Sequence, residues 1–228
     1  MKVIASRGWR RLHRMAARAW LRTQLKKSDA KIARFGEGHA SWWVLAETAP
    51  GAVAYCGGVG LDATYDFALA DKMALEVHSF DPTPTSVEYM QRSNAGRVCF
   101  HPWGFLDRDD KVRFHAPTDP RHANWFVENL HRTDAFFEAD CFTIETAMEK
   151  LGHSKIELLK IDIEGSWARV LTDMLEKGIF PNQLCVEFDS PAPIWSVMKI
   201  VKRLHAEEYQ LVRRSKENCF FIRRMPRY

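Results

Sequence analysis

The chain has 228 residues and a mass of 26.4 kDa, with 46% hydrophobic residues, 27% charged residues and a mean hydropathy of −0.33. This balance is that of an ordinary globular protein, and it argues against a disordered chain, a collagen-like repeat and a small disulfide-stapled scaffold. No run of 18 apolar residues is present, so we expect no membrane-spanning helix. The net charge of +4 is distributed unevenly along the chain.

Residues 1–35 form a strongly basic segment. They contain 11 of the 33 basic residues but only one of the 29 acidic residues, Asp29. The other 193 residues are therefore mildly acidic, which gives no reason to expect a nucleic-acid partner. Apolar residues that recur at spacings of three and four predict an amphipathic helix in this segment: Trp9, Leu12, Met15, Ala16, Ala19 and Trp20.

Three interpretations of this basic helix stay open. It is docked on the core or solvated, it lies on an anionic membrane surface, or it is an organellar targeting peptide. The chain has no apolar stretch of the secretory type, and its five cysteines are scattered without a CxxC pair. We therefore predict buried, reduced thiols and a cytoplasmic protein, membrane-peripheral if residues 1–35 bind lipid. We predict no metal site, because a zinc site needs clustered Cys and His ligands.

From residue 52 onward, strand patterns alternate with helix patterns. The Gly- and Trp-rich stretch 36–50 is expected to be a connecting loop, and residues 116–139 an irregular excursion. Strands are predicted at 52–55, 76–80, 98–101, 112–114, 156–161 and 184–188, helices at 62–75, 84–93, 142–151, 166–177 and 194–207, and a hairpin at 209–213 and 219–223. The alternation predicts βαβ units, and hence one α/β domain over residues 36–228. Its mostly parallel sheet is covered on both faces and ends in an antiparallel hairpin.

The first predicted strand ends in a glycine turn, Cys56-Gly57-Gly58-Val59-Gly60. Ligands of parallel sheets bind beyond the carboxyl ends of the strands, and glycines there let the backbone approach a ligand closely. Asp81 ends the second strand, where a carboxylate can accept hydrogen bonds from both hydroxyls of a ribose. The alternative is that Asp81 only caps the next helix. Together, the turn and Asp81 predict a nucleoside-type cofactor.

Four carboxylates follow two later strands. Asp162 and Glu164 come directly after one strand, while Glu187 and Asp189 lie in or just after the next. A carboxylate inside an apolar strand is costly unless it is paired or functional. Such groups can orient a substrate hydroxyl and accept its proton, and we predict Asp162 first, then Glu164 or Glu187, for this catalytic role. The set could alternatively hold a divalent cation, or serve only in helix capping and salt bridges.

Aromatic residues and histidines offer further candidates. His101 ends the third strand, and Trp103 or Phe105 after it can either flank an adenine ring or pack in the core. His122, in the irregular excursion, is a candidate general base, although a lone loop histidine is more often simply solvated.

Several stretches resemble the FkbM-type methyltransferases, over about residues 38 to 188. The resemblance is carried by Val77-His78-Ser79-Phe80-Asp81-Pro82-Thr83, Phe100-His101-Pro102-Trp103-Gly104, Asp107-Arg108-Asp109 and, most specifically, Leu159-Lys160-Ile161-Asp162-Ile163-Glu164-Gly165. It implies a Rossmann-like methyltransferase fold and S-adenosylmethionine as the cofactor. It also implies methyl transfer to a hydroxyl group of a small-molecule or glycan acceptor, such as a sugar, a glycolipid or a natural product.

The resemblance also implies roles for single residues. Asp81 would bind the ribose hydroxyls, and Asp162 would border both the cofactor and the acceptor. The predicted cofactor-binding residues are Cys56, Gly57, Gly58, Gly60, Asp81, Trp103 and Asp162. The chain departs from the family pattern at Tyr55-Cys56, where an acid is usual, and at Trp167, where a second acid is common. The departure at Trp167 predicts a more apolar acceptor pocket.

Two other functions stay open. Residues 58–63 match a GxGxxA fingerprint, with Asp81 in the place of its acid, which favours an NAD(P)-dependent dehydrogenase or sugar epimerase. No Tyr-xxx-Lys pair is placed for hydride chemistry, however, and residues 162–165 would go unexplained. The second alternative is a catalytically degenerate binding module of the methyltransferase fold, tethered by residues 1–35, which the departures at Tyr55-Cys56 and Trp167 favour.

Overall fold

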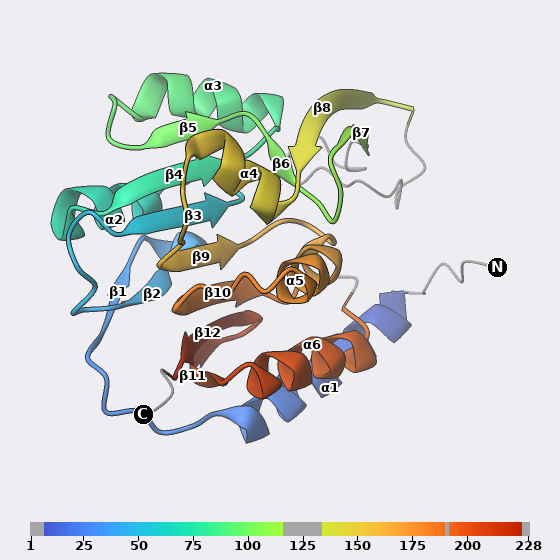
Figure 1. Ribbon diagram of the computed structural model, residues 1–228. Coiled ribbons are helices and arrows are strands. Elements are labelled where there is room, and N and C mark those ends of the chain that lie inside the picture. Colours follow the sequence, from blue (N-terminus) through green and yellow to red (C-terminus); the bar gives the residue numbers. More distant parts are fainter. Residues whose placement is uncertain (1–6, 116–133, 190–191, 225–228) are drawn as a thin grey trace.

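The structure is a computed structural model that describes residues 7–115, 134–189 and 192–224, and its centre is a seven-stranded sheet (Figure 1). The strands of this sheet are β3 (Val53–Gly57), β4 (Glu76–Phe80), β5 (Cys99–His101), β9 (Leu158–Ile161), β10 (Gln183–Glu187), β11 (Tyr209–Ser215) and β12 (Asn218–Arg223). The α-helices are α1 (Arg7–Gln24), α2 (Thr64–Met73), α3 (Pro84–Ser93), α4 (Ile144–Leu151), α5 (Trp167–Glu176) and α6 (Ile194–Ala206). Among the described residues, no helix has both the length and the apolar character that crossing a membrane requires.

The sheet order is β11-β12-β10-β9-β3-β4-β5. Strands β10, β9, β3, β4 and β5 pair in parallel, whereas β12 runs antiparallel to both β10 and β11. The predicted α/β class, with a mostly parallel sheet and a final antiparallel hairpin, is confirmed. Because the strand order reverses between β3 and β9, the carboxyl ends of these two strands are the expected place for a ligand.

Different elements cover the two faces of the sheet. One core packs the sheet against α1, α4, α5 and α6 and includes Tyr55 and Trp167. The other packs it against α2, α3 and the hairpin β1–β2, and includes Trp42. Alternate strand residues serve the two cores, as Leu159 and Leu158 do in β9. Burial on both faces explains why apolar residues lie on both sides of this strand instead of alternating with exposed polar ones.

The predicted loop over residues 36–50 is wrong in part. Trp42–Leu45 forms β2, which pairs antiparallel with β1 (Ile32–Phe35), and a 3₁₀ turn (Gly38–Ala40) lies between them. The indole of Trp42 is fully buried. The short apolar run of β2 lacks the length of a strand signal, and tertiary burial decides its conformation. The predicted boundary between the basic segment 1–35 and the domain 36–228 therefore falls between two strands that hydrogen-bond to each other.

The predicted basic helix is present as α1, and it docks on α6. Ala17 and Leu21 are buried against the core, whereas Leu12 is 65% and Met15 57% exposed. The predicted apolar face is thus rotated from the buried one, because the face that docks is chosen by its fit to α6. The guanidinium of Arg18 also donates two hydrogen bonds, of 2.8 and 2.7 Å, to the carboxylate of Glu217. Docking is confirmed, while membrane contact and targeting stay predictions.

A small second sheet lies beyond the end of β4 (Figure 1). It contains β6 (Gly104–Phe105), β8 (Phe136–Phe142) and β7 (Asp110–His115), in that order. Strand β8 corrects the prediction that the irregular excursion extends to residue 139 and that the next helix begins at 142. Alternate residues of the strand, Phe137, Ala139 and Cys141, pack in a small core against β7, while those between them are exposed. The prediction missed this short alternation. Residues 116–133, with the candidate base His122, lie outside the described residues.

Candidate functional site

Two adjoining cavities open where the parallel strands end. The first has a volume of about 200 Å³ and lies between the ends of β3, β4 and β9 and the small second sheet. The second has a volume of about 1210 Å³ and reaches from the end of β9 to α1 and the β11–β12 turn. Val59, Asp162 and Glu164 line both cavities, so the two meet at these residues.

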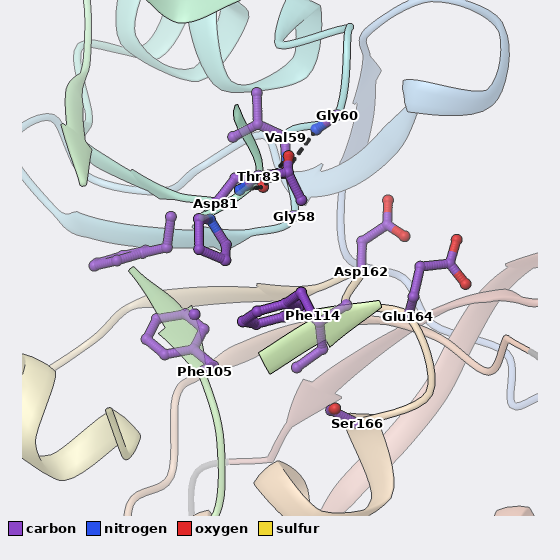
Figure 2. A pocket seen from close by; sticks show the side chains of 14 residues that line it. Gly58, Val59, Gly60, Asp81, Thr83, Phe105, Phe114, Asp162, Glu164 and Ser166 are labelled. Atoms are coloured by element: carbon purple, nitrogen blue, oxygen red, sulfur yellow. Dashed lines mark hydrogen bonds between the residues drawn. The ribbon is translucent and has the colours of Figure 1, made fainter. Parts of the chain in front are cut away.

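The walls of the first cavity differ in chemistry (Figure 2). The turn after β3 contributes the backbone of Gly58 and Gly60, and the rings of Phe105 and Phe114 come from the small sheet. The carboxylates of Asp162 and Glu164 lie on a separate side from these rings in Figure 2. The cavity therefore combines an apolar aromatic surface with a polar turn and two acids.

Packing, as well as ligand access, requires glycines in the turn after β3. Gly58 has a φ of +85°, and a Cβ on it would lie 1.7 Å from the carbonyl oxygen of Asp162. A Cβ on Gly57 would lie 2.9 Å from the ring of Phe105. A Cβ on Gly60, in contrast, would have no heavy atom within 4 Å. Gly57 and Gly58 are thus needed for the close approach of neighbouring chain segments, and Gly60 borders open space.

Asp81 is buried, and protein groups fully engage its carboxylate. Oδ2 accepts hydrogen bonds from the N–H groups of Val59 and Gly60, both at 2.9 Å. Oδ1 accepts one from the N–H of Thr83 at 2.9 Å and one from its hydroxyl at 2.7 Å. Since a carboxylate has about four lone-pair sites, these contacts fill them. Asp81 therefore fixes the turn to β4 and the start of α3, the alternative role that the sequence suggested, and ribose binding stays a prediction.

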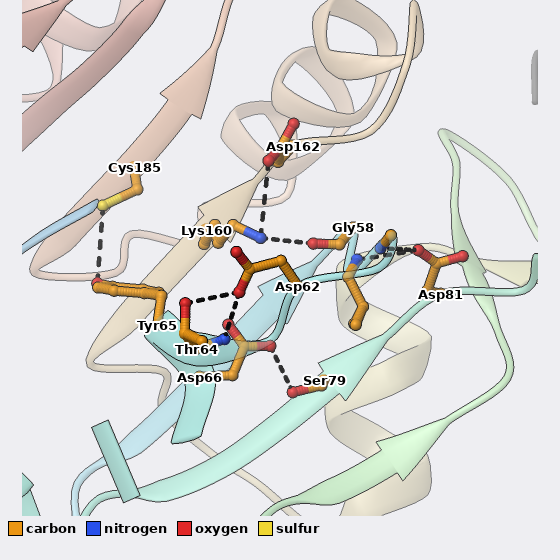
Figure 3. Close-up of polar contacts among 12 residues, drawn as sticks. Gly58, Asp62, Thr64, Tyr65, Asp66, Ser79, Asp81, Lys160, Asp162 and Cys185 are labelled. Atoms are coloured by element: carbon orange, nitrogen blue, oxygen red, sulfur yellow. Dashed lines mark hydrogen bonds and ion pairs between the residues drawn. The ribbon is translucent and has the colours of Figure 1, made fainter. Parts of the chain in front are cut away.

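Lys160 is a buried cation beneath the same turn, and no role for it was predicted from the sequence. Its Nζ donates a hydrogen bond to the carbonyl oxygen of Gly58 and lies 3.7 Å from Oδ2 of Asp162 (Figure 3). Burial alone lowers the pKa of Lys160, but the charges of Asp66 and Asp162 outweigh it and raise this pKa above its usual value. The available signal was a lysine inside an apolar strand, where an uncompensated charge is costly.

Asp66, in the first turn of α2, supplies part of the countercharge for Lys160. Its Oδ2 accepts a hydrogen bond of 2.7 Å from the hydroxyl of Ser79. Burial raises the pKa of Asp66, while Lys160 and the Ser79 hydroxyl act in the opposite direction. Cys56 is fully buried near Asp66, and burial raises the pKa of its thiol. The cysteine is thus part of the layer below the turn.

The four predicted carboxylates converge at the second cavity, which Asp162, Glu164, Glu187 and Asp189 all line. Burial raises the pKa of Glu187, and the neighbouring charges of Asp162 and Glu164 raise it further. Burial and Glu164 also raise the pKa of Asp189, whose Oδ2 accepts a 2.7 Å hydrogen bond from the N–H of Gly165. Neutral pH therefore favours a protonated Glu187 beside Asp162 and Glu164.

Another part of the second cavity is basic. It is lined by Arg10, Arg14 and Arg18 of α1 and by Arg34 of β1. Arg18 pairs with Glu217, and Nε of Arg14 lies 3.8 Å from the same carboxylate. Arg34 donates a hydrogen bond of 2.6 Å to the hydroxyl of Ser41. A cavity lined by both cations and carboxylates suits a polar ligand with several hydrogen-bonding groups.

The structure separates some predicted site residues from the first cavity. Cys56, Gly57 and Trp103 are not among its lining residues, whereas Gly58, Gly60, Asp81 and Asp162 are. Trp103 packs against Phe142, with ring centroids 5.2 Å apart, so Phe105 provides the aromatic wall in its place.

The structure does not place Trp167, which departs from the family pattern, at either cavity. It is buried, with its ring centroid 4.9 Å from that of Phe188.

Comparison with known proteins gives little sequence similarity. No protein-family model matches the chain, and no curated protein sequence matches it. Among solved structures, it is similar to the crystal structure of M. jannaschii TYW2 in complex with AdoMet. The sequence identity is 8% and the TM-score is 0.36, over 87% of this chain and 90% of that chain. The function has to be inferred from the residues of the two cavities.

Proposed function

We propose that this protein is an S-adenosylmethionine-dependent methyltransferase that methylates a hydroxyl group on a sugar, glycolipid or natural product, like the FkbM-type enzymes that its motifs resemble. The observation that carries the proposal is the position of Asp162, which lines both cavities. A carboxylate at the junction of a nucleoside-type cavity and a larger polar one lies where a cofactor methyl group and an acceptor hydroxyl would meet.

The lining of the first cavity suits an adenosine group. Phe105 and Phe114 offer aromatic surface for the adenine, and the turn at Gly60 offers polar backbone beside open space. The volume of about 200 Å³ is below the roughly 300–1,000 Å³ of most ligand pockets. The cofactor would therefore also extend into the second cavity past Val59 and Asp162, which line both.

Asp162 is the group best suited to accept the proton of the acceptor hydroxyl. S-adenosylmethionine, when bound, supplies an activated methyl group on a sulfonium, so the protein has to align the acceptor oxygen and accept its proton. The side chain of Asp162 is 29% exposed at the junction. Glu187 is less suited, because its raised pKa favours the protonated form, which donates a hydrogen bond instead of accepting a proton. Lys160 is a positioning residue that links Gly58 to Asp162.

Two observations favour methyl transfer over the alternative functions. The dinucleotide-binding arrangement has the strand order 3-2-1-4-5-6. Here β12 instead lies antiparallel between β10 and β11, which gives 3-2-1-4-5-7-6 in chain order. In addition, the convergence of four carboxylates at one cavity has no use in hydride transfer to a nicotinamide. That convergence also favours an enzyme over a degenerate binding module.

The aromatic wall provides a test of the proposed cofactor site. We expect Phe114→Leu to weaken equilibrium binding of labelled S-adenosylmethionine about fivefold, because one ring contact with adenine contributes roughly 0.5–1.5 kcal/mol. Trp103→Leu is the matched control, since Trp103 lies outside the lining of the cavity, and its affinity should stay within about twofold. Loss of binding in the Trp103 variant alone, or no binding to the unaltered protein, would reject the proposed site.

We also propose that the outer face of α1 contacts an anionic membrane surface. Leu12 and Met15 are exposed there, and Arg11 and Arg22 on the same helix are exposed as well. Apolar and cationic side chains on one helix are typical of interfacial binding. The helix also lines the second cavity, so this contact would bring a glycolipid acceptor near Asp162.

Flotation with vesicles tests the membrane contact. The unaltered protein should bind vesicles that contain phosphatidylserine and not pure phosphatidylcholine, and Leu12→Ser/Met15→Ser should weaken this binding several-fold. Equal vesicle binding by the double variant would contradict the proposed membrane contact of α1.

A further inference from the structure

A cluster of metal-ligand side chains lies away from both cavities. Glu76 begins β4 and His78 follows two residues later on the same face of the strand, while His153 lies just after α4. The start of β4 and the connection from α4 to β9 lie at the edge of the sheet opposite the strand ends that border the cavities (Figure 1). Among the described residues, this is the one group of three or more His, Cys, Asp or Glu side chains placed to hold a metal ion.

The ligand atoms of the cluster have the spacing that a metal requires. Oε1 of Glu76 lies 3.1 Å from Nε2 of His78 and 3.2 Å from Nε2 of His153, and all three ligand atoms lie within 4.8 Å of one another. In a tetrahedral zinc site with bonds of about 2.0 Å, neighbouring ligand atoms are about 3.3 Å apart. The side chains therefore need only small adjustments to surround one ion.

The local backbone holds His153 in this place. Gly152 ends α4 in the left-handed conformation, with a φ of +74°, and the N–H of His153 donates a hydrogen bond of 2.9 Å to the carbonyl oxygen of Met148. This helix-ending motif turns the chain back toward β4. The third ligand thus comes from a rigid element rather than from a free loop.

Both imidazoles have outer partners that orient them. Nδ1 of His78 lies 3.0 Å from Nε2 of His101, and Nδ1 of His153 lies 2.6 Å from the hydroxyl oxygen of Tyr55. Histidine ligands of metals commonly use their second ring nitrogen in such a contact, which sets the ring orientation and the tautomer. Here this contact leaves Nε2 of each ring directed at Glu76, as in a His₂Glu zinc site.

We propose that Glu76, His78 and His153 bind one Zn²⁺ ion. The side chains of the two histidines are mostly buried, whereas that of Glu76 is 49% exposed, so the ion can enter from solvent and keep a water as its fourth ligand. The ion would join the start of β4 to the α4–β9 connection. Its distance from the cavities makes the site independent of the proposed methyl transfer.

Zinc titration of the full-length protein tests the proposal. After treatment with a chelator and its removal, we expect one equivalent of Zn²⁺ to bind in competition with a chromophoric chelator. Glu76→Gln, His78→Gln and His153→Gln should each weaken this binding at least tenfold. Tyr55→Phe, which removes an outer partner, should weaken it roughly 10–100-fold. His39→Gln is the matched control, because His39 is an exposed histidine outside the cluster.

A spectroscopic measurement distinguishes the site from adventitious binding. Co²⁺ in the same protein should show the intense visible absorption of tetrahedral coordination, and Glu76→Gln should abolish it. Because Glu76 is half exposed, this variant should fold, and circular dichroism of the metal-free protein verifies it. Zinc binding that is equally tight in all three ligand variants, or lost equally with His39→Gln, would show that the cluster is only a hydrogen-bonded network.

Discussion

Asp81 and Asp162 both follow strands of the same sheet and both line the first cavity, yet their surroundings differ. Protein N–H and hydroxyl groups fill the acceptor sites of Asp81. Asp162 instead lies near the cation of Lys160 and near the carboxyl group of Glu187, whose pKa is raised. A carboxylate whose acceptor sites are filled by protein N–H and hydroxyl groups holds the site in shape. One that lies at the junction of two cavities can act on a ligand. The first side chain is therefore expected to govern stability, and the second to govern chemistry.

The largest effect should come from Asp162→Asn. We expect this change to lower the rate of methyl transfer roughly 10³-fold, because a positioned general base contributes about 10²–10⁴-fold. Stability should fall by about 1 kcal/mol, less than for Asp81→Asn, because Asp162 also supplies part of the countercharge of the buried Lys160. The measurement is single-turnover transfer from labelled S-adenosylmethionine, with unfolding in urea alongside. A rate within tenfold of the unaltered protein would show that Asp162 is not the base.

Lys160→Met removes the side chain that contacts both Asp162 and the turn that Asp81 holds. We expect it to lower the free energy of unfolding by about 3 kcal/mol, since it leaves the buried Asp66 without its cation. Urea unfolding measures the loss. The double variant Lys160→Met/Asp66→Asn is the control and should regain part of the stability, because it removes the uncompensated charge as well. Strictly additive losses would contradict a direct coupling of these two side chains.

Asp81→Asn tests whether Asp81 stabilises the folded protein. The amide keeps the shape but provides one acceptor oxygen in place of two, so we expect a loss of about 2 kcal/mol in unfolding free energy without any ligand. Asp71→Asn is the control, because Asp71 has only an exposed ion pair with Arg97, and it should change stability by less than about 0.5 kcal/mol. An unchanged stability of Asp81→Asn would mean that Asp81 serves the ligand alone.

The smallest effect should be a pH dependence caused by Glu187. Its pKa is raised in the folded protein, so its contribution to stability is complete below the ordinary pKa of a glutamate and is lost as the pH rises toward the folded-state pKa. Glu187→Gln removes this loss. Relative to the unaltered protein, the variant should become steadily more stable as the pH rises from 5 to 8. A difference that is constant over this range, measured by thermal unfolding, would argue against a protonated Glu187.

Local patterns in the sequence predicted most of the sheet and its helices. Helix α3 begins at Pro84, and α4 ends at Leu151 directly before Gly152, because proline favours the first helical position and glycine the position after the last turn. Strand β2 and the buried face of α1 were not predicted. Their conformation depends on what they pack against, and periodicity within a short segment does not contain that information.

The candidate site also has features that local sequence patterns predict and features that depend on tertiary structure. The carboxylates Asp162 and Glu187 could be placed together because they follow neighbouring parallel strands. The hydrogen bonds that Asp81 accepts from Thr83 belong to the capping role that the sequence suggested. Those from Val59 and Gly60 could not be predicted, since they depend on the path of the turn after β3. The metal-ligand cluster was missed because Glu76 and His153 are 77 positions apart, and sequence spacing reveals only ligands that are close in the chain.

Calorimetric titration of the purified protein with S-adenosylhomocysteine, beside NAD and NADP, tests the central claim most directly. We predict that S-adenosylhomocysteine alone binds, and that it binds Asp162→Asn about as tightly as the unaltered protein, since that residue is proposed to act on the acceptor. Binding of NAD or NADP instead would contradict the proposed cofactor. Binding of none of the three would mean that the first cavity is not a cofactor site.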